Sequence, residues 1–379
     1  MNQSEFKIKV DWKGLIIKTT ILLILCNLIY ALLIPHLSIG KLTLYNAIFP
    51  GRLRLPYGDD PSQSYNLTLN NLDAMFASHI IAKPGKPTAE FRVVLIGDSA
   101  TWGYLLSNDH TLAGYLNQLQ LFSSDGRKLI FYNLGYPTMS LTKDLMILTR
   151  SLTYQPDLII WLVTLESFPK DKQTSSPLIQ ENLDELFLLI KNNHLENYLS
   201  IPSPQPKNLW KQTIIAQRKQ LADLYRYQLY GFDWAATHID QFIPENLPPR
   251  QEDLTEDLTF HGFQPSHLPI ASLSFPILEA GENLAKPVPV IFVNEPIFIS
   301  HGENSATRYN FYYPRWAYDD YRKWFSDTCK SQNWICWDLW DLIPSTEFTN
   351  TAIHMTPSGT QQSANWIGEQ LANWLKTRP

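Results

Sequence analysis

The chain has 379 residues, of which 44% are hydrophobic and 18% are charged, and its formal net charge is −5. No basic stripe with interleaved aromatic residues is present, so the sequence does not indicate a nucleic-acid-binding protein. The cysteines and histidines do not have the spacing of a zinc site, and neither a metal nor another cofactor is expected. The length fits two or three domains of ~150 residues each, or one α/β domain that carries insertions.

The first candidate element is an apolar stretch near the amino terminus. Residues 19–40 contain no Lys, Arg, Asp or Glu, and the apolar run extends back to residue 15. Because this length is enough to cross ~30 Å of hydrocarbon, we expect residues 1–40 to form a cytoplasmic stub and a transmembrane helix that anchors the protein. A cleaved signal peptide is the alternative, but no small-x-small cleavage site follows the run.

Basic residues on the two sides of this stretch favour one orientation. Four lysines precede or enter it and three basic residues follow it: Lys7, Lys9, Lys13, Lys18, Lys41, Arg52 and Arg54. The slight excess on the amino-terminal side favours a cytoplasmic amino terminus. The body of this single-pass membrane protein is therefore expected on the extracytoplasmic side, in a periplasm or at the cell surface. In that compartment Cys329 and Cys336 form either a short loop disulfide or two buried thiols.

Residues 41–90 are expected to form a juxtamembrane arm that packs on the body through recurring Leu, Ile, Phe and Met. After this arm, apolar runs rich in β-branched residues alternate with helical patterns. The five expected strands are 91–96, 128–132, 157–164, 288–293 and 334–338. Repeated β-α units predict an α/β fold, in which a parallel sheet of about five strands carries helices on both faces. This is a three-layer α/β/α architecture of the flavodoxin-like kind.

The predicted domain spans residues 91–379 and is interrupted after its third strand. Residues 169–285 are expected to form one insertion, with helices over 182–192 and 211–230. At the carboxyl edge of the sheet such an insertion would make a lid or a wall of the substrate site. Its histidines are expected at the surface or in packing rather than as ligands: His238, His261 and His267.

The first strand ends in the tripeptide Gly97-Asp98-Ser99. A glycine at the strand end allows a sharp turn, which leaves the next side chains at the carboxyl edge, where open α/β sheets bind ligands. A serine there can act as a nucleophile if a base reaches it. Alternatively, the tripeptide only turns the chain and caps a helix. A polar pair, Asn294 and Glu295, ends the fourth strand and either lines the same site or caps its strand.

The candidate base lies far along the chain, in the segment FTNTAIHMTPSG over residues 348–359. Thr356 fits the N-cap of the final helix and Pro357 its first position, so His354 lies in the loop just before that helix. GDSATWG near the start of the body, paired with a histidine in an IHMTPSG loop before the last helix, resembles the SGNH/GDSL hydrolase family over residues 90–379. The resemblance extends to anchored SGNH-like proteins that modify exopolysaccharides or cell-wall polymers.

The resemblance implies an SGNH-hydrolase-like fold and roles for individual residues. Ser99 would be the nucleophile and one backbone oxyanion donor, and His354 the general base. The second block of the family supplies another backbone N–H to the oxyanion hole; its glycine position falls on Thr138, and Gly135 is an earlier turn residue. Glu166 stands where the third block has an Asn whose amide donates to the oxyanion. An ionised carboxylate would repel that charge, whereas a Glu kept neutral by burial could donate.

The third member of the triad departs from the family pattern. The family places an Asp three residues before the histidine, and this chain has Thr351 there. Asn350, one residue earlier, is the candidate in a slightly longer loop, because an amide can hold an imidazole tautomer, although it stabilises an imidazolium less than a carboxylate does. A backbone carbonyl is the other possibility, and Asp338 and Asp341 are alternative partners.

These observations predict a membrane-anchored serine ester hydrolase that works through an acyl-serine intermediate. If a glycan hydroxyl rather than water receives the acyl group, the protein is an O-acyltransferase of a surface polysaccharide or cell-wall polymer. In that case a membrane partner would have to deliver a cytoplasmic acyl donor. The altered third block also permits a glycan-binding protein that has lost catalysis. The high aromatic share, 13% with 12 Trp, indicates either an aromatic core or stacking against sugars around residues 309–324.

Overall fold

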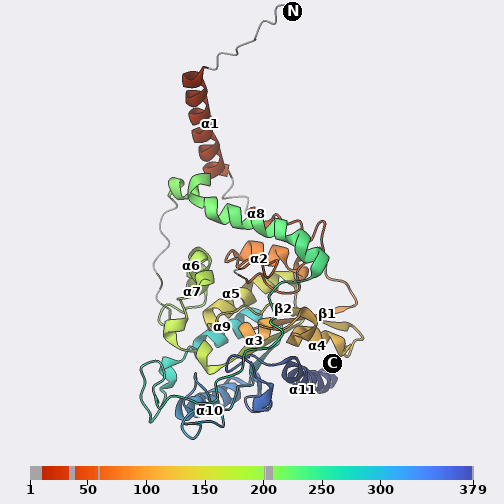
Figure 1. Cartoon of the computed structure of the whole chain (residues 1–379). Helices are drawn as coiled ribbons and strands as arrows, with labels where there is room; N and C mark the ends of the chain where they lie inside the picture. The colour runs from red at the N-terminus through yellow and green to blue at the C-terminus, as the bar shows by residue number, and fades with distance from the viewer. Residues whose placement is uncertain (1–10, 34–38, 59, 200, 202–207, 378–379) are drawn as a thin grey trace, which may run out of the picture.

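A computed structural model describes residues 11–33, 39–58, 60–199, 201 and 208–377. Residues 1–10, which include most of the expected cytoplasmic stub with Lys7 and Lys9, lie outside the described residues. The long helix α1 (Trp12–Leu33) projects away from the body of the molecule, as Figure 1 shows. Within the described residues it is the single helix long and apolar enough to cross a membrane, and nearly all of its side chains are exposed.

The body is built on one parallel sheet with the strand order β2-β1-β3-β4-β5. Its strands are β1 (Glu90–Ile96), β2 (Lys128–Asn133), β3 (Leu158–Val163), β4 (Val290–Asn294) and β5 (Ile335–Asp338). Each hydrogen-bonded pair is parallel, and the register sets Val93 of β1 opposite Phe131 of β2 on one side and Leu158 of β3 on the other. The predicted α/β fold with a five-stranded parallel sheet is confirmed.

Alternate residues of the central strands enter two separate hydrophobic cores, because successive side chains of a strand point to opposite faces. Val93 and Leu95 pack in the core that includes Leu116 and Ile367, from helices α4 (Leu112–Gln118) and α11 (Pro357–Lys376). Val94 and Ile96 of the same strand enter the other core. That second core receives helices α5 (Leu141–Ser151), α9 (Phe275–Ala285) and α10 (Arg315–Gln332). The sheet is therefore covered on both faces.

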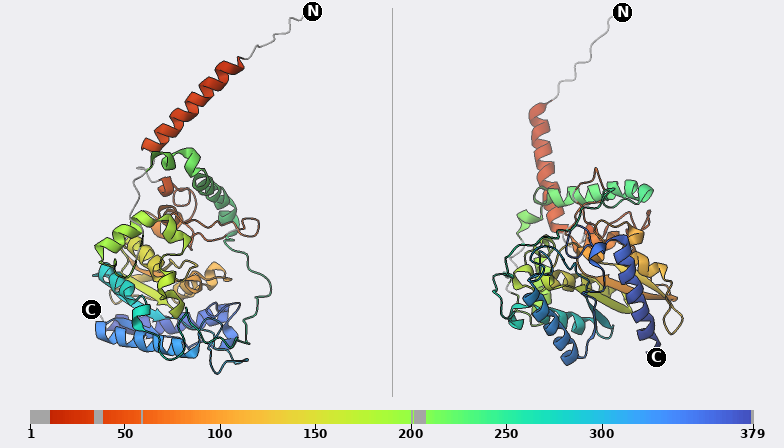
Figure 2. Two further views of the ribbon diagram at one scale, coloured as in Figure 1. Left: turned by 90° about the vertical axis from the view of Figure 1, so that its left-hand side faces the viewer. Right: turned by 60° about the horizontal axis from the view of Figure 1, so that its bottom comes forward.

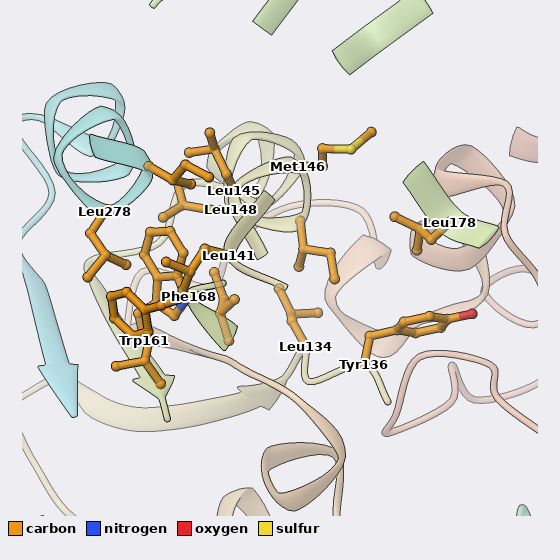
Figure 3. Packing of buried hydrophobic residues seen from close by; sticks show 14 of the residues in the cluster. Leu134, Tyr136, Leu141, Leu145, Met146, Leu148, Trp161, Phe168, Leu178 and Leu278 are labelled. Carbon is orange, nitrogen blue, oxygen red and sulfur yellow. The ribbon is translucent and has the colours of Figure 1, made fainter. Parts of the chain in front are cut away.

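Figure 3 shows the second core at close range. Leu141, Leu145 and Leu148 extend from α5, and Trp161 of β3 and Leu278 of α9 belong to the same cluster. All five side chains are fully buried. The layered fold therefore resumes at Phe275, inside the range 169–285 that was expected to be an insertion. The sequence pattern concealed α9 because its eleven residues include Pro276 and Gly281, which interrupt the helical signal.

Between β3 and α9 the described residues form three α-helices, α6 (Pro177–Glu181), α7 (Leu183–Asn192) and α8 (Ile214–Thr237). Figure 1 and both views of Figure 2 show α8 lying between the end of α1 and the body. The chain after α8 returns along the body, where Asp240 forms a buried ion pair with Arg54.

Residues 41–90 form an ordered arm on the body and include the helix α2 (Leu72–Ser78). Arg54 is buried and donates to the backbone oxygens of Gly103 (2.9 Å) and Leu106 (3.0 Å). Trp102 Nε1 donates to the oxygen of Leu55 at 2.8 Å. The arm is thus tied to the segment that directly follows Ser99.

Cys329 and Cys336 form a disulfide that links the last turns of α10 to β5. Of the two arrangements left open by the sequence, the structure has the oxidised one. Cys26 in α1 is free and exposed.

Candidate active site

Ser99 is the first residue of a short helix, α3 (Ser99–Trp102), that begins where β1 ends. The Asp98 side chain caps this helix by accepting the N–H of Ala100 at 2.8 Å. The Ser99 N–H has no hydrogen-bond partner within the part of the chain that the structure describes. The tripeptide therefore both caps a helix and presents a serine at the carboxyl edge of the sheet.

His354 is held in a small closed loop before α11. Thr349 N–H donates to the oxygen of His354 at 2.8 Å, and His354 N–H donates to Thr351 Oγ1 at 3.1 Å. Thr356 caps α11 by accepting the N–H of Gly359. These contacts fix the direction of the imidazole.

The structure brings the three predicted triad residues together. His354 Nε2 lies 2.7 Å from Ser99 Oγ, and His354 Nδ1 lies 2.9 Å from Asn350 Oδ1. Because an amide oxygen only accepts hydrogen bonds, Nδ1 carries the proton, and Nε2 is free to accept the hydroxyl proton of Ser99. The predicted proximity of Ser99 and His354 is observed, although 255 positions separate them.

The alternative partners for the histidine are engaged elsewhere. Asp338 accepts from Asn294 Nδ2 at 2.7 Å and pairs with Arg322 at 2.8 Å. Asp341 is exposed, and the described residues include no contact between it and His354. Asn350 is thus the residue that orients the imidazole.

We expect Asn350→Ala to lower kcat/KM about tenfold, because it removes one hydrogen bond worth roughly 1–1.5 kcal/mol from the imidazole. Asn350→Asp should instead raise the pKa of His354 by placing a negative charge beside the ring. Steady-state kinetics at several pH values check both effects. An unchanged rate in Asn350→Ala would mean that the loop backbone alone orients His354.

Burial lowers the pKa of His354 from 6.5 to about 4. The side chain is largely enclosed, with 7% of the residue exposed. A cationic imidazolium is poorly solvated there, so the neutral ring, which is the form that can accept a proton, is favoured.

The activity should consequently persist into acid. Neutral His354 is the active form, so kcat/KM should be constant above the His354 pKa and fall as the pH drops through about 4. The measurement is kcat/KM for an uncharged ester from neutral to acidic pH, with the released alcohol quantified by chromatography. If kcat/KM instead falls as the pH drops through about 6.5, the imidazole is solvated when it accepts the proton.

The two backbone donors expected beside Ser99 are already used within their own loop. Gly135 N–H donates to Asn133 Oδ1 at 3.1 Å, and Thr138 N–H donates to the oxygen of Tyr136 at 2.7 Å. Gly135 instead serves packing: an added Cβ would lie 2.4 Å from the backbone nitrogen of Trp102. The expectation that Gly135 donates to an oxyanion is wrong, because its N–H is bound. Thr138 does line the pocket of Ser99.

Glu166 lies in a single 3₁₀ turn (Leu165–Ser167) after β3 and contacts two basic side chains. Lys172 Nζ lies 2.9 Å from its Oε1, and His261 Nε2 lies 3.1 Å from the same oxygen. His261 Nδ1 also lies 3.0 Å from Asp171. Hydrogen bonding to Glu166, ahead of the other causes, raises the pKa of His261 and favours its cationic form. Glu166 therefore accepts a hydrogen bond from the ammonium group of Lys172, and its role as an oxyanion donor stays a prediction.

A pocket of about 420 Å³ opens in front of Ser99 and His354. Its remaining lining comes from distant parts of the chain: Tyr57, Tyr104, Pro137, Thr138, Met139, Glu166, Lys172 and Tyr312. Tyr104 packs against the imidazole, with ring centroids 4.9 Å apart. The three tyrosines give the pocket an aromatic wall beside a charged one.

Sequence reasoning missed several of these residues. Tyr57 lies in the arm, and Lys172 and His261 lie in segments without a periodic pattern. His261 is exposed, as expected for a surface histidine, and its Nε2 also lies 3.1 Å from Glu166 Oε1. Tyr312 lies in the aromatic stretch 309–324 that the sequence marked, and Lys172 lies in the range 169–285 that was expected to form a lid or a wall of the site.

A buried polar cluster supports the turn that carries Ser99. Lys143 Nζ donates to the oxygens of Gly97 (2.7 Å) and Tyr136 (3.1 Å) and pairs with Asp144. Burial raises the pKa of Asp98 to about 6 and raises that of Glu295 well above its usual value. After burial, the charge of the Asp98 carboxyl group is the next cause that raises the pKa of Glu295. Of the two residues that end β4, Glu295 thus supports Asp98 and does not line the pocket.

No group of three or more His, Cys, Asp or Glu side chains in the described part of the chain has an arrangement that could hold a metal ion.

No protein-family model and no curated protein matches the sequence. Among solved structures, the chain is similar to a lipolytic protein of the G-D-S-L family from Desulfitobacterium hafniense, at 12% identity and a TM-score of 0.31 over 74% of this chain and 98% of that one. A carbohydrate acetylesterase family member from Sinorhizobium meliloti has 12% identity and a TM-score of 0.34, with 75% and 99% covered. An aryl esterase of M. smegmatis has 11% identity and a TM-score of 0.33, with 74% and 98% covered. Likenesses this remote carry no weight for the reaction.

The parallel five-stranded sheet, the serine after β1 and the histidine before the final helix are those that the resemblance to SGNH/GDSL hydrolases implies.

Proposed function

We propose that this protein is a membrane-anchored serine ester hydrolase that acts outside the cytoplasm. The observation that carries the proposal is the chain of hydrogen bonds from Asn350 through His354 to Ser99, which opens into a pocket. A serine bound to a neutral, oriented imidazole is an activated nucleophile.

In the first half of the reaction, Ser99 Oγ attacks the ester carbonyl and its proton moves to His354 Nε2. Asn350 acts as a positioning residue, since it holds the proton of Nδ1 and so keeps Nε2 available. The C–O bond to the alcohol then breaks, and His354 gives its proton to the departing oxygen. The products of this half are the free alcohol and acyl-Ser99.

The tetrahedral intermediate carries a negative oxygen that needs positive partners. The Ser99 N–H is one donor. We assign the second contribution to the ammonium group of Lys172, which lines the same pocket and is oriented by Glu166. A fixed cation in a partly enclosed site stabilises developing negative charge more than it would in water.

In the second half, a hydroxyl compound attacks acyl-Ser99 while His354 accepts its proton. The bond from the acyl carbon to Ser99 Oγ then breaks, and His354 returns the proton to Oγ. Water gives a carboxylic acid and makes the protein an esterase. A glycan hydroxyl gives a new ester and makes it an O-acyltransferase. Two observations favour this second candidate: Tyr57, Tyr104 and Tyr312 offer rings for a sugar, and the carboxylate of Glu166 lies in the pocket as a possible acceptor base. A glycan is then the acceptor substrate, and its acyl ester is the product.

The proposed location rests on α1 and on the disulfide. α1 has 22 residues and no acidic side chain, which is enough for one membrane crossing. The Cys329–Cys336 disulfide suits an oxidising compartment outside the cytoplasm. A separate membrane partner would supply any activated acyl donor.

The test is to trap the acyl-enzyme. The full chain in detergent is mixed with p-nitrophenyl acetate, quenched in acid and digested, and the Ser99 peptide should gain the mass of one acetyl group. Repeating the reaction with a short glucan oligosaccharide then separates the two enzymes: free acetate indicates hydrolysis, and an acetylated oligosaccharide indicates transfer. A folded protein that gains no acetyl group at Ser99 would contradict both and leave the glycan-binding protein.

A further inference from the structure

The helix α8 carries apolar side chains on two opposite sides. On the inner side, Tyr227, Gly231 and Trp234 are buried against the arm. The ring of Tyr45 lies 5.4 Å from that of Tyr227 and 5.8 Å from that of Trp234. At Gly231 an added Cβ would lie 2.3 Å from the Tyr45 hydroxyl, so the contact requires glycine. This side explains how α8 is fixed to the body.

The other side of α8 carries exposed apolar residues, of which Phe232 also packs edge-on against Phe49 with ring centroids 4.8 Å apart. Tyr225, Leu229 and Phe232 are 67%, 44% and 53% exposed. They follow the spacing i, i+4, i+7, which makes one stripe along a helix. Each lies two positions before a residue of the inner stripe, which is a rotation of about 200° at 3.6 residues per turn. We call this stripe, with Ile214 at its amino-terminal end, the outer face of α8; Trp210 and Ile215 are exposed beside that end.

The outer face lies where α1 meets the body. Tyr30 Oη donates to Gln217 Oε1 at 3.0 Å, and Ile215 N–H donates to Asn27 Oδ1 at 3.1 Å. The end of α1 therefore contacts the first turns of α8. Figures 1 and 2 show that α8 crosses the end of α1 and does not continue it. If α1 crosses a bilayer, α8 lies at the level of that bilayer's surface.

The charges of α8 suit the same place. Basic side chains are exposed in α8 and in the turn before it: Lys211, Arg218, Lys219 and Arg226. Arg218 lies in line with Tyr225, Lys219 and Arg226 lie to one side of the stripe, and Arg226 also pairs with Asp223. Amphipathic helices that carry Lys and Arg beside an apolar face bind in the interface of membranes that contain anionic lipids. Aromatic residues such as Tyr225 and Trp210 are enriched at that depth.

We propose that the outer face of α8 is embedded in the interface of the bilayer that α1 crosses, and that the two helices together fix the orientation of the body on the membrane. The proposal goes beyond the catalytic function and rests only on α1 being a membrane anchor. The occupant of the outer face is lipid, because this face is continuous with the end of α1. A soluble partner would have to bind against the membrane surface.

Spin labelling of the full chain in liposomes that contain anionic lipid tests the proposal. Nitroxides are attached to cysteines introduced at Leu229→Cys and Phe232→Cys in a Cys26→Ser background, in which the remaining cysteines form the disulfide. Gln361→Cys on α11, exposed and in another layer, is the matched control. Collision rates with oxygen, which concentrates in lipid, and with a water-soluble nickel chelate are measured. We expect the oxygen-to-nickel ratio at 229 and 232 to be several-fold higher than at 361.

Two results would overturn the proposal. Nickel access at 229 and 232 equal to that at 361 would place the outer face in water. Low access to both reagents, together with spin–spin broadening, would show that a second copy covers it. Alkaline carbonate extraction of the same samples tests the anchor separately. Release of the protein would contradict the proposed anchoring, and labels that still face lipid would then support a surface-bound α8.

Discussion

Ser99→Ala should lower kcat/KM for p-nitrophenyl acetate by about 10⁴-fold or more. The variant lacks the hydroxyl oxygen that forms the acyl-enzyme. The remaining hydrogen bond between His354 and Asn350 and the pocket itself do not supply another nucleophile. Because Ser99 is half-buried at the start of a helix capped by Asp98, the smaller side chain fits and the melting temperature should stay close to that of the parent protein. Labelling by a fluorophosphonate should disappear in parallel.

The matched control is Ser331→Ala, an exposed serine on α10 whose hydroxyl contacts only its own helix. Its activity and labelling should equal those of the parent protein. Labelling that survives in Ser99→Ala would identify another nucleophile. Turnover that survives would show that the hydrogen-bonded pair with His354 is structural.

The sheet and the triad could be read from the sequence because each depends on local signals. β1, β2, β3 and β4 are apolar runs buried on both sides, which is the pattern of a parallel strand between two helix layers. Ser99 and His354 lie beside a strand end and a helix cap, and both features have sequence signatures. Parallel strands bring their carboxyl ends to one edge, so the meeting of two residues 255 positions apart follows from the fold.

The charged wall of the pocket could not be read in this way. His261 reaches Glu166 from an irregular segment, and Tyr57 reaches the pocket from the arm. The positions of such residues depend on tertiary contacts such as the Arg54–Asp240 ion pair. Periodic patterns in the sequence do not predict contacts of this kind. The hydrogen bond that occupies the N–H of Gly135 is equally invisible in sequence, which is why a plausible oxyanion donor was assigned there.

Glu166 and Lys172 should affect turnover in opposite directions. Lys172→Met removes the cation that we assign to the oxyanion, and we expect kcat to fall by about 10²-fold. Lys170→Met, in the same turn but outside the pocket, is the control and should leave kcat unchanged.

Glu166→Gln keeps the shape of the side chain and removes a negative charge from the pocket. We expect kcat for a small activated ester to rise about tenfold, because the charge that opposes the oxyanion is gone while Lys172 remains. The loss in unfolding free energy should be about 1 kcal/mol or less, since the ammonium of Lys172 is more than a third exposed and its ion pair is screened by water. The pKa of His261 should fall towards its usual value, because Glu166 is the main cause that raises it, and an NMR titration of the imidazole measures this directly.

The two variants together decide what the charged wall does. If Lys172→Met is fully active and Glu166→Gln only lowers the melting temperature, the ion pair is structural and the oxyanion is stabilised elsewhere. If Glu166→Gln instead loses turnover at an unchanged melting temperature, the carboxylate takes part in the chemistry. Its place in the pocket, which three tyrosines also line, then suits activation of an acceptor hydroxyl. In that case the loss should be larger for transfer to an oligosaccharide than for hydrolysis, because water can still be activated by His354 alone, and O-acyl transfer becomes the better account of this site.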